Sequence, residues 1–211
     1  MNVLVFGASG GIGTWVVHYA LQNGHRVTAY VRHPEKMRQH NENLTVVQGE
    51  ITDQGKITDA LAGQDAVIWC VGIPMKWKYP AMQSLEGHRI LIQAMQKRGV
   101  KRLIDWGTPS IRSARDKKSF VTVAPGILAG LIFPQAKREM VAIGKLIEAS
   151  DLDWTIIRFM APKNIHYTGK VKVEFGDTKL NFGVSRADIG AFMVEQLGSS
   201  RFVGAMSIIG S

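Results

Sequence analysis

Residues 3–13 read VLVFGASGGIG, an apolar run that leads into a glycine-rich turn. The run Val3–Phe6 is wholly apolar, as expected of a strand that is buried on both faces of a parallel sheet. A helix is predicted over residues 14–23, where apolar residues recur at helical spacing and Gly24 supplies a stop. A strand, a glycine-rich turn and a helix in this order predict the opening unit of a parallel α/β sheet.

The turn contains glycine at positions 7, 10, 11 and 13. Such glycines allow a tight turn, a close approach of the backbone to a pyrophosphate, and close packing of the helix on the strand. The exposed N–H groups and the positive end of the helix would then bind phosphates. A merely tight turn, the alternative, would rarely need four glycines. We therefore predict a nucleotide-binding loop made of Gly7, Ser9, Gly10, Gly11, Ile12 and Gly13.

Strand and helix patterns alternate along the rest of the chain. Strands are predicted over residues 27–31, 44–47, 66–71, 100–106 and 154–159, and helices over 54–61, 84–98 and 134–149. The last quarter is more mixed, with a strand over 170–175, a helix over 186–197 and a strand over 206–209. This order predicts a doubly wound parallel sheet with helices on both faces and a small C-terminal extension on the substrate side. No linker or repeat divides the chain, so we expect a single domain over residues 1–211.

Charge and composition limit the classes of partner and of site that the protein is expected to have. The net charge is +9, from 26 Lys and Arg against 17 Asp and Glu, which favours an anionic partner such as a phosphate-bearing cofactor, nucleic acid or a membrane surface. The basic residues are dispersed and form no recognition motif, so no nucleic-acid partner is expected. The single cysteine, Cys70, excludes an intrachain disulfide, and the six histidines lack metal-site spacing, so no metal is expected.

The longest apolar stretch covers residues 120–134. It contains two prolines and two glycines and is too short to span a bilayer. The N-terminus has no basic region and no cleavage site, so we expect a cytoplasmic protein without a membrane span.

Seven segments together resemble one family. They are GASGGIG (7–13), VTAYVRHPEKM (27–37), VVQGEITD (46–53), LAGQDAVIWCVG (61–72), GVKRLIDWGTPS (99–110), AKREMVAIGKLIEASDLDWTIIRFMAP (136–162) and SRADIGAFM (185–193). With the spacing G-x-x-G-x-x-G, they resemble the atypical short-chain dehydrogenase/reductases, in particular the NmrA-like and biliverdin-reductase-B (flavin-reductase)-like group. The resemblance covers most of the chain and implies a Rossmann-like domain that binds NAD(P).

The residues at the end of the second predicted strand indicate whether the cofactor is NAD or NADP. A site for NAD places Asp or Glu there, whereas this strand ends Val31-Arg32-His33, with Lys36 just beyond. A carboxylate would repel a 2′-phosphate, and a guanidinium can bind it with two hydrogen bonds. We therefore predict NADP(H) as the cofactor, with Arg32 at the 2′-phosphate. The alternative is that Arg32 is a solvated surface charge.

The resemblance implies further cofactor contacts. Asp53 matches the acid that contacts the adenine in the family, with Ile51 or Thr52 beside it. Val71 and Gly72 match the loop that passes under the adenosine, and the small Gly72 fits a close backbone approach. Trp69 and Cys70, on the preceding strand, are expected in the core, because a buried cysteine usually behaves as a small hydrophobic residue.

Substrate chemistry is expected beyond the carboxyl ends of the strands. The resemblance implies Thr108 as the active-site hydroxyl, which orients a substrate carbonyl or the nicotinamide of the cofactor, with Ser110 as a fallback. It also implies Lys137 as the lysine of a Tyr-x-x-x-Lys pair that holds the cofactor. Phe133 then stands at the tyrosine position and has no proton to give. The alternatives are that Thr108 caps the turn before Pro109 and that Lys137 is a surface lysine.

The sequence thus predicts an NADP(H)-binding oxidoreductase that transfers hydride to a flavin, a quinone or a related conjugated small molecule. Such acceptors need no acid from the enzyme. The alternative is a non-catalytic, NADP(H)-sensing regulator of NmrA-like type. Residues 112–134 begin basic and become apolar, which leaves four readings open: a substrate-covering lid, a homodimer surface, a membrane-surface contact and a loop packed on its own domain.

Overall fold

The computed structural model describes residues 1–117, 127–176 and 183–210. Its strands form one sheet in the order β3-β2-β1-β4-β5-β6-β8-β7. Every neighbouring pair is parallel except β7 and β8, which are antiparallel. The strands are β1 (Asn2–Phe6), β2 (Arg26–Val31), β3 (Leu44–Gln48), β4 (Ala66–Trp69), β5 (Arg102–Gly107), β6 (Asp153–Arg158), β7 (Lys172–Glu174) and β8 (Ala205–Gly210). The predicted doubly wound, Rossmann-like sheet is confirmed.

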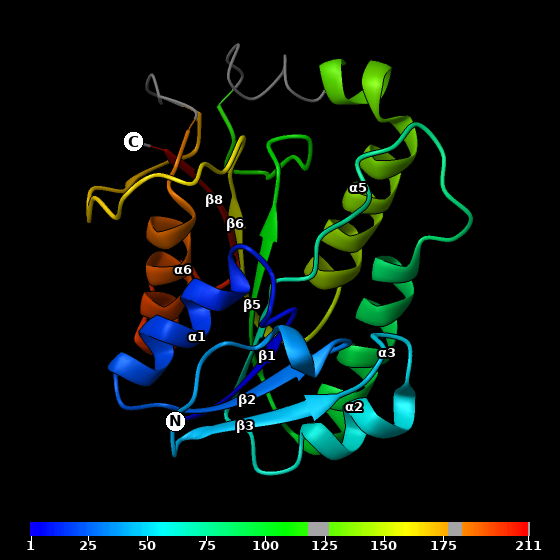
Figure 1. Cartoon of the computed structure of the whole chain (residues 1–211). Helices are drawn as coiled ribbons and strands as arrows, with labels where there is room; N and C mark the ends of the chain where they lie inside the picture. Colours follow the sequence, from blue (N-terminus) through cyan, green and yellow to red (C-terminus); the bar gives the residue numbers. More distant parts are fainter. Residues whose placement is uncertain (118–126, 177–182, 211) are drawn as a thin grey trace.

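Helices cover both faces of the sheet (Figure 1). Helices α1 and α6 pack together on one face, and α2, α3 and α5 cover the other. Residues 127–132 form a further helical turn before α5. The helices are α1 (Gly13–Gln22), α2 (Gln54–Ala60), α3 (Gln83–Arg98), α5 (Pro134–Glu148) and α6 (Arg186–Glu195), with short 3-10 turns over Pro34–Lys36 and Gln196–Gly198.

The first strand shows why an apolar run predicted a buried strand. Successive side chains of a strand point to opposite faces. Val3 and Val5 therefore belong to the cluster under α1 and α6, whereas Leu4 and Phe6 belong to the cluster under α2, α3 and α5. All four side chains are fully buried.

Three predicted strands are shorter in the structure, and the one expected over 100–106 begins later, as β5 (Arg102–Gly107). The strand expected over 170–175 is β7, a three-residue edge strand. The strand expected over 66–71 ends at Trp69, and the loop after it is held by a hydrogen bond of 3.0 Å from the indole N–H of Trp106 to the carbonyl oxygen of Val71. Part of the segment 112–134, residues 118–126, lies outside the described residues.

The sheet order places the crevice of the fold. Strand order reverses between β1 and β4, and ligands of such sheets bind beyond the carboxyl ends of the strands at this point. None of the helices in the described ranges is long and apolar enough to cross a membrane.

Candidate functional site

A cleft of about 1310 Å³ opens at the carboxyl ends of the strands. Its walls come from the glycine-rich loop, the loop after β4, the end of β5, the turn 127–132, the start of α5, the loop after β6 and the start of α6. The volume exceeds the roughly 300–1,000 Å³ of most small-molecule sites. The cleft therefore has room for part of a dinucleotide and a second small molecule.

The glycine-rich loop can only be built from glycine at two of its positions. Gly7 has φ +71, and a Cβ there would lie 2.9 Å from the carbonyl carbon of Cys70. A Cβ on Gly13 would lie 2.1 Å from the carbonyl oxygen of Gly7, so the helix can approach the strand only without a side chain. These contacts explain the spacing of the glycines in terms of the turn and the helix packing.

The N-terminus of α1 is left open toward an anion. Ile12 at its N-cap makes no side-chain cap, and the first turn contains no acid. By contrast, Asp53 caps α2 and Ser185 caps α6. Thr14 N donates to the carbonyl oxygen of Gly10 at 3.0 Å, and the N–H groups before it have no place in the helical ladder. This loop fits a bound phosphate.

The cleft brings together about half of the residues singled out from the sequence. Its lining includes Gly10, Gly11, Ile12, Gly72, Thr108, Ser110 and Lys137. The remaining candidates are not in its lining: Gly7, Ser9, Gly13, Arg32, Ile51, Asp53 and Val71. The space beside Gly72 is free of protein atoms, since no described heavy atom lies within 4 Å of a Cβ placed there.

Three residues expected to contact the adenosine side of the cofactor, Arg32, Ile51 and Asp53, lie outside the lining of the cleft. Arg32 follows β2 and is exposed, and its carbonyl oxygen accepts from Gln48 Nε2 at 3.3 Å. One carboxylate oxygen of Asp53 accepts from Lys56 N at 3.0 Å, which is a helix-capping role the sequence did not indicate. The carbonyl oxygen of Ile51 faces Gly87, where a Cβ would lie 2.8 Å away. The cofactor roles of these residues stay predictions.

Two hydroxyls and a lysine lie on the substrate side. The Oγ1 atom of Thr108 and the Oγ atom of Ser110 are hydrogen bonded at 2.5 Å, so the Thr108 hydroxyl is engaged with a neighbouring side chain. Lys137 lies in the first turn of α5, and its Nζ atom would be 3.0 Å from a Cβ on Gly130. Phe133 lines the same cleft.

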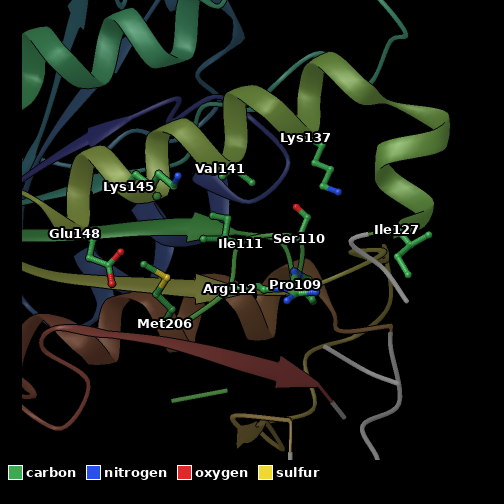
Figure 2. A pocket seen from close by; sticks show the side chains of 11 residues that line it. Pro109, Ser110, Ile111, Arg112, Ile127, Lys137, Val141, Lys145, Glu148 and Met206 are labelled. Atoms are coloured by element: carbon green, nitrogen blue, oxygen red, sulfur yellow. The ribbon is translucent and has the colours of Figure 1, made fainter. Parts of the chain in front are cut away.

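A second cavity, of about 390 Å³, lies beside the first one and shares Ser110 and Lys137 with it. Figure 2 shows Ser110, Arg112 and Lys137 around one end, and Lys145 and Glu148 at the other. Ser110 and Lys137 therefore lie at the boundary between two spaces.

Cys70 departs from the sequence expectation. Trp69 is fully buried, as expected, but Cys70 follows the end of β4, is only half-buried and lines the cleft. Desolvation raises the pKa of the Cys70 thiol well above its usual range, and the Asp105 carboxylate adds to this effect. The raised pKa favours the thiol over the nucleophilic thiolate, which fits a place in the wall of the cleft.

Trp106, the last residue of the strand predicted over 100–106, forms part of the cleft wall. Its indole N–H holds the loop after β4 through Val71 O, and its ring stacks with that of Phe159 at 5.8 Å between centroids. The signal that could have found it is a tryptophan at the carboxyl end of a predicted parallel strand, because its aromatic side chain also has a hydrogen-bond donor.

Buried polar side chains anchor the loops around the cleft, and the sequence did not reveal them. Glu139 of α5 is fully buried and accepts from the Tyr79 hydroxyl at 2.5 Å and from Leu85 N at 2.9 Å. Burial and this hydrogen bond raise the pKa of Tyr79 above its usual range. Arg158 of β6 is fully buried, forms a two-oxygen ion pair with Asp116 and so holds the loop after β5.

Arg186, the first residue of α6, is the other functional candidate that the sequence did not reveal. Its Nε atom would lie 3.0 Å from a Cβ on Gly11, so its guanidinium lies over the glycine-rich loop and lines the cleft. Within the described ranges, no group of three or more His, Cys, Asp or Glu side chains is placed to hold a metal ion.

The family comparison matches nearly the whole chain. A family model described as NAD(P)H-binding matches residues 7–200. An uncharacterised chloroplastic protein of Arabidopsis thaliana is 27% identical over 207 residues, which cover 93% of this chain and 71% of the relative. The 3-beta-hydroxysteroid dehydrogenase of Mycolicibacterium neoaurum is 31% identical over 120 residues, 52% of this chain, and the match spans only 32% of that relative.

Solved structures share the fold at low sequence identity. An oxidoreductase of Lactococcus lactis superposes with a TM-score of 0.79 at 20% identity, over 100% of this chain and 91% of that one. A short-chain dehydrogenase/reductase of Veillonella parvula in complex with NADP gives 0.78 at 18% identity, over 100% and 94%. ChuY of Escherichia coli O157:H7, an anaerobillin reductase, gives 0.77 at 22% identity, over 100% and 97%.

Proposed function

The chain belongs to the NAD(P)H-binding family, and we propose that within it the protein is an NADP(H)-dependent oxidoreductase. It transfers hydride to a conjugated acceptor such as a flavin or a quinone. The observation that carries the proposal is the cleft, which joins a phosphate-binding loop at one end to an apolar chamber with two hydroxyls and a lysine at the other.

The cofactor side follows from charge and backbone geometry. The open N-terminus of α1 and the glycine-rich loop would hold the bridging phosphates. Arg32 stands at the end of β2 with no acid at that strand end, which favours a 2′-phosphate over a free 2′-hydroxyl. Gly72 leaves room for the adenosine side of the cofactor, and Lys137 would hold the nicotinamide ribose.

The substrate side favours a flat and largely apolar ring. Ile73, Phe133, Met140 and Phe159 line this part of the cleft. Thr108, backed by Ser110, would orient the acceptor or the nicotinamide through its hydroxyl. The reduced nicotinamide supplies the hydride, and the proton that completes reduction of a flavin or quinone comes from water. The side chains of this wall therefore position the acceptor and exclude water, and none of them has to act as an acid.

Two neighbours of the same fold are consistent with this proposal. One is a short-chain dehydrogenase/reductase solved with NADP, and the other is the anaerobillin reductase ChuY. Both likenesses concern the fold, so they support a nicotinamide cofactor and a reductase role without naming the substrate.

A second candidate function is a non-catalytic sensor of NADP(H). Phe133 favours it, because no tyrosine stands among the described residues that line the cleft. A sensor would bind the cofactor and present the 127–132 turn and its neighbours to a protein partner.

One assay separates the two functions. NADPH oxidation is followed in the presence of FMN, FAD, dichlorophenolindophenol and small quinones, with NADPH affinity measured in parallel by calorimetry. We expect NADPH binding with turnover of at least one acceptor, and Thr108→Val should lower that turnover without weakening NADPH binding. Binding without turnover would instead establish the sensor, and the absence of both would contradict both functions.

A further inference from the structure

We propose that Arg186 binds the bridging phosphates of the cofactor, covering the glycine-rich loop from the side of α6, and that Asn164 couples it to the loop after β6. The inference rests on the proposed function only in requiring a dinucleotide in the cleft. It adds a phosphate ligand and a link between the cofactor and substrate sides.

The contact between Arg186 and Gly11 is direct. The Nε and Cδ atoms of Arg186 would lie 3.0 and 3.1 Å from a Cβ on Gly11, and Cζ would lie 3.8 Å from it. Any larger residue at position 11 would displace the arginine. Gly11 thus serves a second purpose besides the turn, since its missing side chain makes room for a guanidinium over the phosphate loop.

Among the described residues, no carboxylate neutralises the charge of Arg186. Its Nη1 donates to the amide oxygen of Asn164, which is an uncharged acceptor. No ion pair found in the described ranges involves Arg186, whereas the buried Arg158 is paired with Asp116. An unpaired guanidinium beside an anion-binding loop is suited to a phosphate, which it can bind through two parallel hydrogen bonds.

Helix packing places the N-termini of α1 and α6 next to each other. Arg186 faces Gly11, and one turn further along Gly190 faces Trp15, where a Cβ would lie 2.7 Å from the tryptophan Cβ. The two contacts advance together along both chains, so α1 and α6 run parallel with their N-termini adjacent. Of the two, α1 leaves its N-terminus open, whereas Ser185 caps α6 and Asp188 lies in its first turn, so it is the partial positive charge of α1 that adds to that of Arg186. The uncapped start of α1 supplies N–H groups that the helical ladder leaves free for a phosphate.

Backbone hydrogen bonds connect Arg186 to the substrate side. Lys163 N donates to Val184 O at 2.9 Å, and Arg186 N donates to Lys163 O at 3.0 Å. The Ser185 hydroxyl donates to Ile165 O at 3.1 Å. Asn164 lies within this joined segment and lines the cleft. A phosphate that fixes the guanidinium therefore also fixes the loop after β6, which forms one wall of the acceptor chamber.

Calorimetric titration with NADPH and NADH distinguishes the proposed role of Arg186 from that of Arg32. A charge-assisted hydrogen bond to phosphate corresponds to roughly a ten- to hundredfold change in affinity. Arg186→Ala should weaken both nucleotides by this factor equally, because both contain the bridging phosphates. Arg32→Ala should weaken NADPH alone. Binding of 2′-AMP, which lacks bridging phosphates, should be lost with Arg32→Ala and unchanged with Arg186→Ala.

The coupling through Asn164 has its own readout. NADPH should protect the amides of residues 161–168 from hydrogen exchange in the wild-type protein. Asn164→Ala should keep NADPH affinity within about threefold, since the guanidinium remains, and should lose most of that protection. Arg186→Lys keeps the charge without the fork geometry and should lie between wild type and Arg186→Ala.

Three outcomes would overturn the proposal. They are NADPH affinity within threefold of wild type in a folded Arg186→Ala variant, a loss confined to NADPH, and full protection of residues 161–168 in Asn164→Ala. If Arg186→Ala does not fold, Arg186→Gln, which retains a donor for Asn164, is measured by the same criteria. A wild-type protein that binds NADPH but turns over no acceptor would contradict the proposed enzyme and leave this phosphate site standing.

Discussion

The Nε2 atom of His88 lies 2.8 Å from the Oδ2 atom of Asp105, and both side chains are buried between α3 and β5. The Nδ1 atom of His88 lies 2.6 Å from the carbonyl oxygen of Ser84, which can only accept, so Nδ1 carries a hydrogen. The other carboxylate oxygen accepts from Trp106 N at 2.7 Å. The pair therefore holds the end of β5, next to the cleft wall formed by Trp106.

Removing the carboxylate of Asp105 should destabilise the protein more than replacing it with an uncharged amide of the same shape. Asp105→Ala leaves His88 and Trp106 N without partners in the core, and we expect a loss of about 3–5 kcal/mol in the free energy of unfolding. In Asp105→Asn the amide NH₂ can donate to Nε2 of a neutral His88 while the amide oxygen accepts from Trp106 N. The loss should then stay near 1 kcal/mol. Urea unfolding measures both, and equal losses would mean that the charge matters more than the hydrogen bonds.

Arg32 should set the preference between the two nicotinamide cofactors. It is exposed at the end of β2, where a 2′-phosphate would meet it. Wild type should bind NADPH at least tenfold more tightly than NADH, and Arg32→Asp should reverse the order through repulsion of the phosphate. Calorimetry on both variants with both nucleotides provides the test. Equal affinity of the wild-type protein for the two would refute the assignment of Arg32.

Gly10 should be essential for binding but not for folding. A Cβ there would lie 3.1 Å from Gly7 O, a tight contact that a small shift relieves, while the rest of a valine would occupy the phosphate position. Gly10→Val should therefore abolish NADPH binding with little change in melting temperature. Gly13→Ala is the contrasting variant, because its Cβ would lie 2.1 Å from Gly7 O and should unfold the turn itself. Gly198→Ala, with open space around it, serves as the neutral control.

Tyr30 should make the protein sensitive to alkali. Its hydroxyl donates to Glu50 O at 3.0 Å, and burial, with help from the Asp53 and Glu50 carboxylates, raises the pKa of Tyr30 to about 12. The folded-state pKa thus lies above the unfolded value of about 10. The stabilising contribution is complete below about pH 10 and is lost as the pH rises toward 12.

Urea unfolding between about pH 9 and pH 12 tests this effect. The unfolding free energy of wild type should fall across the window by about 1–2 kcal/mol more than that of Tyr30→Phe, which has no hydroxyl to ionise. Parallel curves for the two proteins would show that Tyr30 ionises as easily in the folded state as in the unfolded one.

Local signals in the sequence were enough to predict the sheet and its helices. The apolar run of β1, the four glycines and the alternation of helices and strands each depend on neighbours a few residues away. The limits of β4 could not be predicted in this way. The strand stops two residues early and gives way to a loop that the indole of Trp106, 35 residues further along the chain, holds through the carbonyl oxygen of Val71.

The missed parts of the site all depend on distant pairs. In the sequence, Arg158 is only a polar residue in a largely apolar strand. Its role becomes clear from the structure, where it forms an ion pair with Asp116, 42 residues earlier. In the sequence, Arg186 is only the first residue of a predicted helix. In the structure, the packing of α6 on α1 places it over Gly11. Such long-range pairs cannot be predicted from a single sequence. The geometry of the glycine-rich loop can, because it depends on four glycines that are close together in the chain.

Phe133 should block the reduction of simple ketones, and a tyrosine in its place should permit it. Phe133 is the N-cap residue of α5, its carbonyl oxygen accepts from Lys137 N at 2.9 Å, and both residues line the same cleft. In Phe133→Tyr the Lys137 ammonium would lower the pKa of the new phenol and keep it ready to donate a proton to a carbonyl oxygen. A positioned acid of this kind raises rates by about 10²–10⁴-fold, so slow ketone reduction should emerge with a pH profile that wild type lacks. Phe133→Leu controls for the loss of the ring, and Phe133→Tyr combined with Lys137→Met should lose the new activity. If Phe133→Tyr binds NADPH and reduces flavins like wild type but never acts on ketones, the ring at position 133 does not face the nicotinamide, and Thr108 remains as the polar group that orients the acceptor.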